Sequence, residues 1–192
     1  MRFAVTRETT ATRPTDERGP LFPTLLGLLA ALSLLVASSS ARALSLAALS
    51  LDDLTAGADV VVRARCIDRV PTRVGGRIES VARFAVIDRL AGDAEDVVEV
   101  RQWGGRTAER QTVVPGAPLS EPGDEAVLFL ASEPDGSYRV VGVAQGYLPV
   151  VPSALATPVV RVSRTLGPEF GTASAWPVER FAESVRRLAR SR

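Results

Sequence analysis

The chain has 192 residues, of which 46% are hydrophobic and 23% are charged, and its formal net charge is +1. This is the composition of an ordinary globular domain together with one apolar segment. Every basic residue is arginine, because the sequence contains no lysine and no histidine. These absences exclude a Ser-His-Asp triad, an imidazole metal ligand, a lysine Schiff base and a P-loop lysine. The single cysteine excludes an internal disulfide and a thiolate cluster for zinc or iron and sulfur.

The first 43 residues have the order of a secretory signal peptide. Four arginines come first: Arg2, Arg7, Arg13 and Arg18. An apolar run follows from Leu21 to Ala37, and Ala41 and Ala43 then provide the small residues of a cleavage site. We predict cleavage after Ala43. The alternative is that the segment from Leu21 to Ala37 stays uncleaved and anchors the chain in a membrane.

Residues 44–192 have the length of one domain. They contain 18 arginines and 19 acidic residues, so their net charge is about −1. A weakly charged domain has no electrostatic footprint for nucleic acid, and a nucleic-acid partner is therefore not expected.

The first predicted elements of this domain are a short helix and a strand. Ser50 followed by Asp53 forms a capping-box pattern, which predicts a helix that ends near Gly57. The segment VVVRARCIDRV then alternates with a period of two, which predicts a strand with an apolar face and an arginine face. The apolar face holds Val60, Val62, Ala64 and Cys66, and the other face holds Arg63, Arg65 and Arg69. Cys66 is therefore predicted to be a packed core thiol.

The next segments predict a hairpin and a long loop. Residues 71–77, with two adjacent glycines, are predicted to connect the first strand to a second strand at 78–90. A third strand is predicted at 97–103, where Val98 and Val100 face the core. About twenty residues rich in glycine and proline follow, from 104 to 124, and a loop of this length is either functional or poorly ordered.

The rest of the chain predicts more strands and a closing helix. Further strands are predicted at 126–132, 138–146, 147–151 and 159–163. From about 177 to 190 the period becomes helical, with Val178, Phe181, Val185 and Leu188 on one face, so this helix should dock on the sheet. The predicted fold of 44–192 is a single, mainly β domain. It is a small antiparallel barrel or sandwich, with an OB-like barrel as one form, a short N-terminal helix and an amphipathic C-terminal helix.

A family resemblance extends over most of this domain. Its motifs are ADVVVRARC, FAVIDRLAGD, VVEVRQWGG, PGDEAVLFL, YRVVGVAQGYLPV and VERFAESVRRL. They resemble an uncharacterised family of exported bacterial small β-barrel proteins, whose pattern is ADxVVxGxV, GEEVLLFL and GLAQG. The strand order is also similar to the OB-like barrel of netrin-type and metalloprotease-inhibitor modules. Those modules depend on cysteine pairs, which Cys66 alone cannot form. The resemblance therefore implies the fold and export, and it implies no catalytic residues.

The candidate binding site is an outward row on the first and third predicted strands. Its members are Arg63, Arg65, Arg101 and Trp103. Guanidinium groups beside an indole could bind a carboxylate, a sugar or an aromatic ligand, and the loop at 104–124 could close over them. The alternative is a solvated strand face on which arginine stems cover apolar surface.

Acidic residues gather at predicted turns and helix starts. The groups are Asp52 with Asp53, Asp93 with Glu95 and Asp96, and Asp124 with Glu125. None has the spacing of a calcium loop, so we predict capping or solvated roles. No catalytic set, no metal site and no cofactor is expected.

These observations predict an exported, non-enzymatic β-barrel that acts as an interaction or ligand-binding module of the cell envelope. Its expected partner is an envelope or extracellular protein or a small ligand, and a membrane is a partner only if the signal segment is uncleaved. Two alternatives remain open. One is a carboxylate-based hydrolase, which needs no histidine. The other is a structural envelope protein anchored through Leu21 to Ala37.

Overall fold

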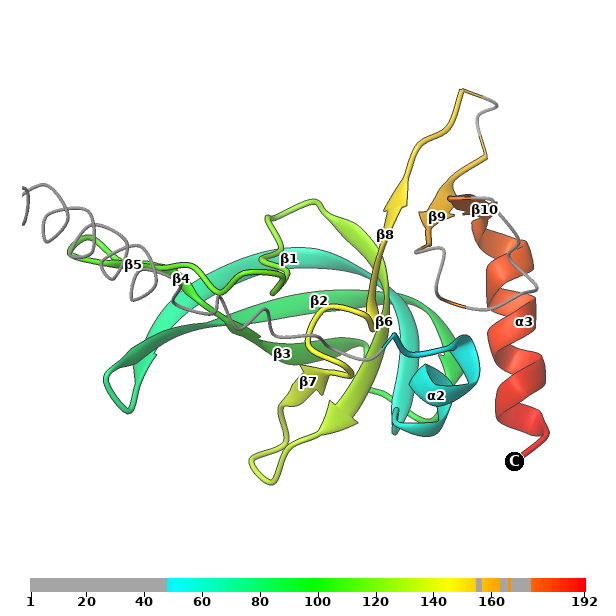
Figure 1. The fold of residues 1–192 in the computed structure, drawn as a ribbon, viewed down its shortest axis with the longest axis horizontal. Helices are drawn as coiled ribbons and strands as arrows, with labels where there is room; N and C mark the ends of the chain where they lie inside the picture. The colour runs from blue at the N-terminus through cyan, green and yellow to red at the C-terminus, as the bar shows by residue number, and fades with distance from the viewer. Residues whose placement is uncertain (1–47, 155–156, 163–165, 167–173) are drawn as a thin grey trace, which may run out of the picture. The chain divides into compact units, whose positions relative to one another are not determined.

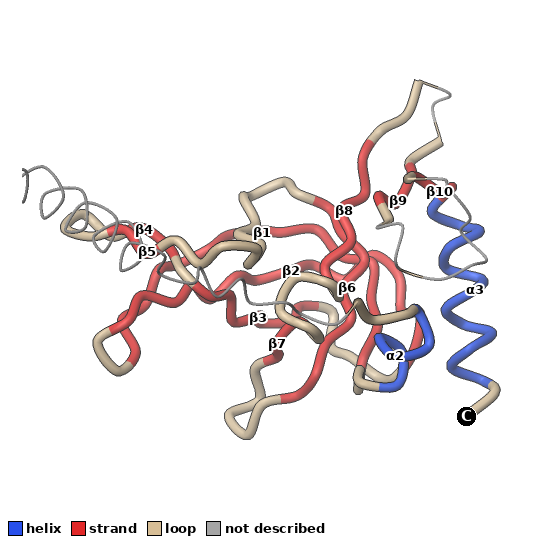
Figure 2. The backbone as a smooth tube through the Cα atoms, in the orientation of Figure 1, coloured by secondary structure: helices blue, strands red, loops and turns tan. Residues whose placement is uncertain are grey.

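The computed structural model describes residues 48–154, 157–162, 166 and 174–192. All of them belong to the unit Leu46–Arg192, and the predicted signal segment, with Ala41 and Ala43, lies outside the described residues. The elements, shown in Figures 1 and 2, are α2 (Leu51–Ala56), β1 (Val60–Val74), β2 (Arg77–Ala91), β3 (Val97–Trp103), β4 (Gly105–Arg106), β5 (Gln111–Thr112), β6 (Glu125–Ser132), β7 (Tyr138–Val140), β8 (Tyr147–Val151), β9 (Val159–Arg161), β10 (Ala175–Pro177) and α3 (Val178–Arg190).

Five of these strands form a closed barrel. Their order is β1-β2-β3-β7-β6, and β6 pairs back onto β1. Strands β3 and β7 run parallel, whereas the other neighbours in the barrel are antiparallel. The predicted mainly β barrel is thus confirmed, and it is antiparallel except for the β3–β7 pair. From β6 the sheet continues outward through β8, β9 and β10.

Irregular pairing on β1 allows this strand to take part in closing the barrel. Its register against β2 shifts at three places along the strand, from Val61 to Asp68. Such bulges bend a strand and increase its twist, which closure of a small sheet requires. The β1–β2 turn is tighter than the predicted connection at 71–77, because both strands continue up to Gly75 and Gly76. Both glycines have positive φ, as a two-residue hairpin turn requires.

The apolar residues form two cores on the two faces of the barrel wall. The inner core contains the predicted inward residues of β1 and β3, including Cys66, together with Phe84 and Leu128. The outer core lies between the barrel and the elements that cover it, and it contains Val61, Phe129 and Phe181. The capping box at the start of α2 is present, and the prediction that the C-terminal helix docks is confirmed. Figure 1 shows α2 and α3 beside this outer face.

The predicted loop at 104–124 contains regular secondary structure. It contains the two-stranded hairpin β4–β5, and its second half packs on the barrel through Ser120. Both backbone and side-chain groups of Ser120 bond to the Gln102 amide: Gln102 Nε2 donates to Ser120 Oγ at 2.7 Å, and Ser120 N donates to Gln102 Oε1 at 3.1 Å. A polar side chain buried at the end of β3 therefore fixes this loop, which local composition did not indicate.

The predicted strand at 138–146 is also corrected, because β7 ends at Val140. Residues 141–146 leave the sheet as a compact excursion, in which Gly142 and Val143 both have positive φ. The excursion closes on one residue of β6: Val141 N donates to the Phe129 carbonyl, and Phe129 N donates to the Gly146 carbonyl. Strand β8 then resumes beside β6, so the apolar run in the sequence is two strands that share one partner.

Candidate ligand-binding groove

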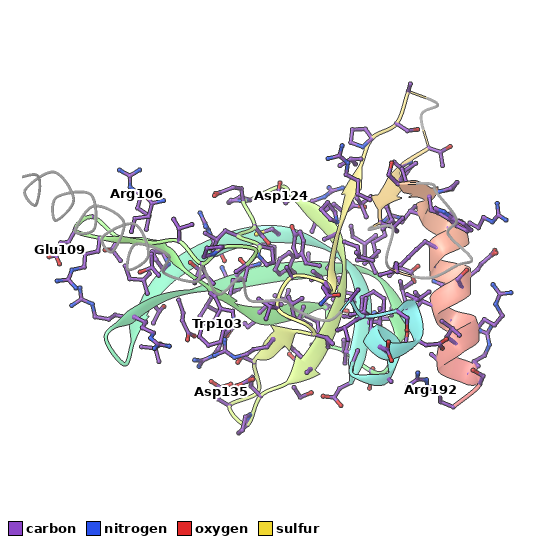
Figure 3. The ribbon with its side chains drawn as sticks, in the orientation of Figure 1. Trp103, Arg106, Glu109, Asp124, Asp135 and Arg192 are labelled. Carbon is purple, nitrogen blue, oxygen red and sulfur yellow. The ribbon has the colours of Figure 1, made fainter. Side chains whose placement is uncertain are left out.

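The structure divides the predicted outward row into two clusters. Strand β2 lies between β1, which carries Arg63 and Arg65, and β3, which carries Arg101 and Trp103. The arginines of β1 turn toward β6, whereas Arg101 and Trp103 contact residues at β7 and the turn before it. Figure 3 labels Asp124, the residue before Glu125, and shows it apart from Trp103 and Asp135 of the second cluster. The two clusters therefore need separate accounts.

The first cluster is centred on Glu125, a residue that we expected to be solvated or to cap a turn. Its side chain is only 12% exposed, and it accepts from Arg63 Nε at 2.6 Å and from Arg65 Nη2 at 2.8 Å. In the β1–β6 ladder Arg65 lies directly opposite Glu125, and Arg63 is its diagonal neighbour on the same face. The prediction for Glu125 was therefore wrong, because Glu125 on β6 forms ion pairs with the outward arginines of β1.

Opposing effects act on the pKa of Glu125. Burial raises this pKa, but the hydrogen bonds and charges of Arg65 and Arg63 lower it by more, so that it lies below its ordinary value. The carboxyl group is consequently ionised at neutral pH. A general acid needs a carboxyl whose pKa is raised instead. Glu125 is therefore better suited to accept hydrogen bonds from the two arginines than to donate a proton to a substrate.

An open groove of about 830 Å³ passes over this arginine–glutamate–arginine cluster. Its walls come from the start of β6, from β8, from residues 118–124 and from the β8–β9 connection. The apolar part of the lining includes Pro118, Leu119, Pro149, Val150, Val151, Pro152 and Pro158. The predicted closing loop therefore does border a site, but at the β1 arginines. Arg65 is the more accessible of the two, with a side chain that is 60% exposed.

The second cluster is packed too closely to admit a ligand. The Arg139 guanidinium lies 4.4 Å from the centre of the Trp103 ring and donates to Glu79 Oε2 at 3.3 Å. The Glu79 side chain is 8% exposed, and Arg101 pairs with Asp135 at the edge of the cluster. The adjoining void, beside Trp103 and Pro118, has a volume of about 10 Å³, which is no more than one water molecule occupies. Trp103 therefore serves packing in this structure.

Cys66 belongs to the inner core, and its backbone pairs with residues 123 and 124: Cys66 N donates to the Asp124 carbonyl at 2.8 Å, and Gly123 N donates to the Cys66 carbonyl at 2.9 Å. Its Sγ donates to the Asp68 carbonyl at 3.4 Å, and burial, with Asp124 and Asp68 nearby, raises the pKa of the thiol. The predicted core thiol is confirmed.

Within the described ranges, no group of three or more cysteine, aspartate or glutamate side chains is placed to hold a metal ion. Over the same part of the chain, no helix has both the length and the apolar character needed to cross a bilayer.

Sequence reasoning missed Glu125, Glu79 and Arg139. For Glu125 a signal existed, because it is the one charged residue at the start of a strand that is otherwise apolar. Glu79 and Arg139 join strands far apart in the sequence, and no local pattern marks them. A comparison with models of known protein families finds no match to this chain, and a comparison with curated proteins finds none either.

Proposed function

We propose that this chain is an exported, non-enzymatic barrel module of the cell envelope that binds an extended peptide segment of a partner protein. The observation that carries the proposal is the open groove over Arg63, Glu125 and Arg65. Large, partly apolar concavities with a few convergent polar groups are the usual sites of ligand binding.

The lining favours a peptide over a polyanion. Its charged side chains are two arginines and two acidic residues, Asp124 and Glu125, so that the groove carries no net charge. Donors and an acceptor stand side by side, as the polar groups of a peptide require. The prolines and valines along the walls offer apolar contact at a small entropic cost, because their side chains have few rotamers.

The hydrolase alternative has less support. Every carboxyl group with a resolved shift in the described part of the chain, at Asp53, Asp59, Asp68, Glu125 and Asp135, has a lowered pKa. A carboxylate-based hydrolase needs one carboxyl that stays protonated near neutral pH.

Selection from a random peptide library displayed on phage tests the proposal. Peptides selected on the wild-type protein should bind Arg65→Ala at least about tenfold more weakly. The matched control is Arg89→Ala, because Arg89 is also an exposed strand arginine with one carboxylate partner, Asp96. Failure to select any peptide, or equal binding to Arg65→Ala and the wild type, would overturn the proposal.

The export part of the proposal has its own test. The intact mass and location of the protein in a bacterial host should show a chain that begins at Leu44, in the periplasm or the medium. A full-length chain in the membrane fraction would instead favour the anchored alternative.

A further inference from the structure

Two hairpins reach beyond the end of the barrel that lies opposite α3 (Figure 1). We call the ends of these hairpins, residues 73–77 of β1–β2 and 106–110 of β4–β5, the hairpin tips. The hairpins lie against each other, because a Cβ at Gly105 would come within 2.4 Å of Ser80 Oγ and 3.2 Å of Ile78 Cγ2. Arg73 and Glu109 join the tips across 3.7 Å. The two tips therefore form one surface.

This surface has a local positive charge that the net charge of the domain conceals. The tips hold Arg73, Arg77, Arg106 and Arg110 against one acidic residue, Glu109, which gives a charge of +3. Because residues 44–192 total about −1, the rest of this domain carries about −4. Figure 3 shows Arg106 and Glu109 at this end of the structure.

Three of these four arginines have no carboxylate partner among the residues that the structure describes. Arg77, Arg106 and Arg110 form no ion pair within the described ranges, whereas Arg63, Arg65, Arg83, Arg89 and Arg139 all do. An arginine without a partner keeps its guanidinium available to a phosphate, which it can bind with two parallel hydrogen bonds.

Exposed valines accompany the arginines. Val74 lies in one tip and is 40% exposed, while Val70 and Val113 lie just behind the tips and are 57% and 67% exposed. A polyanion such as nucleic acid would use the arginines and leave the valines in water. A lipid surface would use both, with phosphates at the guanidinium groups and valines in the interfacial region.

We propose that the hairpin tips dock the protein on an anionic lipid surface. Lipid phosphates bind Arg77, Arg106 and Arg110, and Val74 and Val113 enter the interface beside them. The groove lies on another part of the barrel, so this contact is independent of the proposed peptide binding and leaves the groove open to a partner.

Sedimentation with vesicles tests the proposal on the purified exported chain. The vesicles contain phosphatidylcholine alone or equal parts of phosphatidylcholine and phosphatidylglycerol. Because each basic residue near such a surface contributes about fivefold to binding, Arg77→Glu with Arg106→Glu should lower binding to the anionic vesicles by at least about tenfold. Binding of the wild type should fall as salt is added.

A matched double variant controls for total charge. Arg161 and Arg190 are also exposed, and they have no ion pair in the described part of the chain. Arg161→Glu with Arg190→Glu should bind within about twofold of the wild type, because both residues lie away from the tips. Equal losses in the two double variants, or no loss at the tips, would overturn the proposal.

The valines distinguish a lipid surface from a polyanion. Val74→Ser with Val113→Ser should weaken vesicle binding and leave the thermal unfolding midpoint unchanged, because both side chains are exposed. Unchanged vesicle binding in this variant, with binding of a DNA oligonucleotide through the same arginines, would show a polyanion site and overturn the lipid proposal.

Discussion

The two halves of β1 have the same kind of sequence and different surroundings. In the first half, Val60–Cys66, all the apolar residues are buried, in the inner core or, for Val61, in the outer core that includes α3, and only Arg63 and Arg65 reach the groove. The second half, to Val74, is exposed from Val70 onward. Both halves contain valines and arginines, so composition alone does not show whether a segment is covered. Coverage depends on elements that lie up to 120 residues away in the sequence, such as α3.

The largest expected effect on stability comes from a substitution in α3, which packs in the outer core with the first half of β1. Phe181 is fully buried in the outer core, and Phe181→Ala should lower the free energy of unfolding by about 3–5 kcal/mol through lost burial and a residual cavity. Chemical denaturation measures this change. Val70→Ala, in the exposed half of β1, is the control and should stay within about 0.5 kcal/mol. Similar effects of the two substitutions would mean that the two halves of β1 do not differ in how far they are buried.

A smaller effect is expected where the two hairpins touch. Gly105 has a φ of 146°, and a Cβ there would meet Ser80 and Ile78. Gly105→Ala should therefore cost about 2 kcal/mol or more in the free energy of unfolding. Gly116 also has positive φ but open space around it, so Gly116→Ala should cost only the backbone strain, about 1 kcal/mol. If both variants lose the same stability, the contact between the hairpins contributes nothing.

Acid should weaken the ion pairs in the first half of β1 more than the ion pair in the second half. The pKa of Glu125 is lowered by Arg65 and Arg63, so its ionised form contributes stability above the unfolded pKa, and this contribution disappears as the pH falls through the folded pKa. The difference in stability between wild type and Glu125→Gln should thus be larger at neutral pH than at about pH 3. Denaturation at both pH values measures it.

Asp68 provides the comparison for Glu125. Its pKa is lowered by Arg83, but the pair is exposed to solvent, so Asp68→Asn should change the pH dependence less than Glu125→Gln does. A difference between wild type and Glu125→Gln that does not vary with pH would contradict the role assigned to this pair.

The smallest effect concerns Cys66, near the boundary between the two halves. Its thiol is buried and its pKa is raised, so an aromatic disulfide reagent should label it very slowly in the native protein near pH 8. Denatured protein should take up one label per chain, since the sequence has a single cysteine. Fast native labelling would place the end of the inner core in contact with solvent.

The sequence allowed prediction of the features that depend on neighbouring residues. These are the cap at Ser50, the alternation of β1, the core position of Cys66 and the apolar face of α3. The features that were missed depend on distant pairing. Closure of β1 on β6, and with it the role of Glu125, joins residues about sixty positions apart. The excursion at 141–146 was missed because Val143 adopts a positive φ that a β-branched residue rarely takes.

Because of that excursion, β6 forms backbone hydrogen bonds with three different strands. On one edge β6 pairs with β1, and on the other it pairs with β7 of the barrel and β8 of the outer layer. Neither layer can detach without breaking bonds to β6, so the barrel and its cover should open as one cooperative unit. The amide protons of β6 should accordingly exchange with solvent only through global unfolding, while those of the hairpin tips exchange by local fraying.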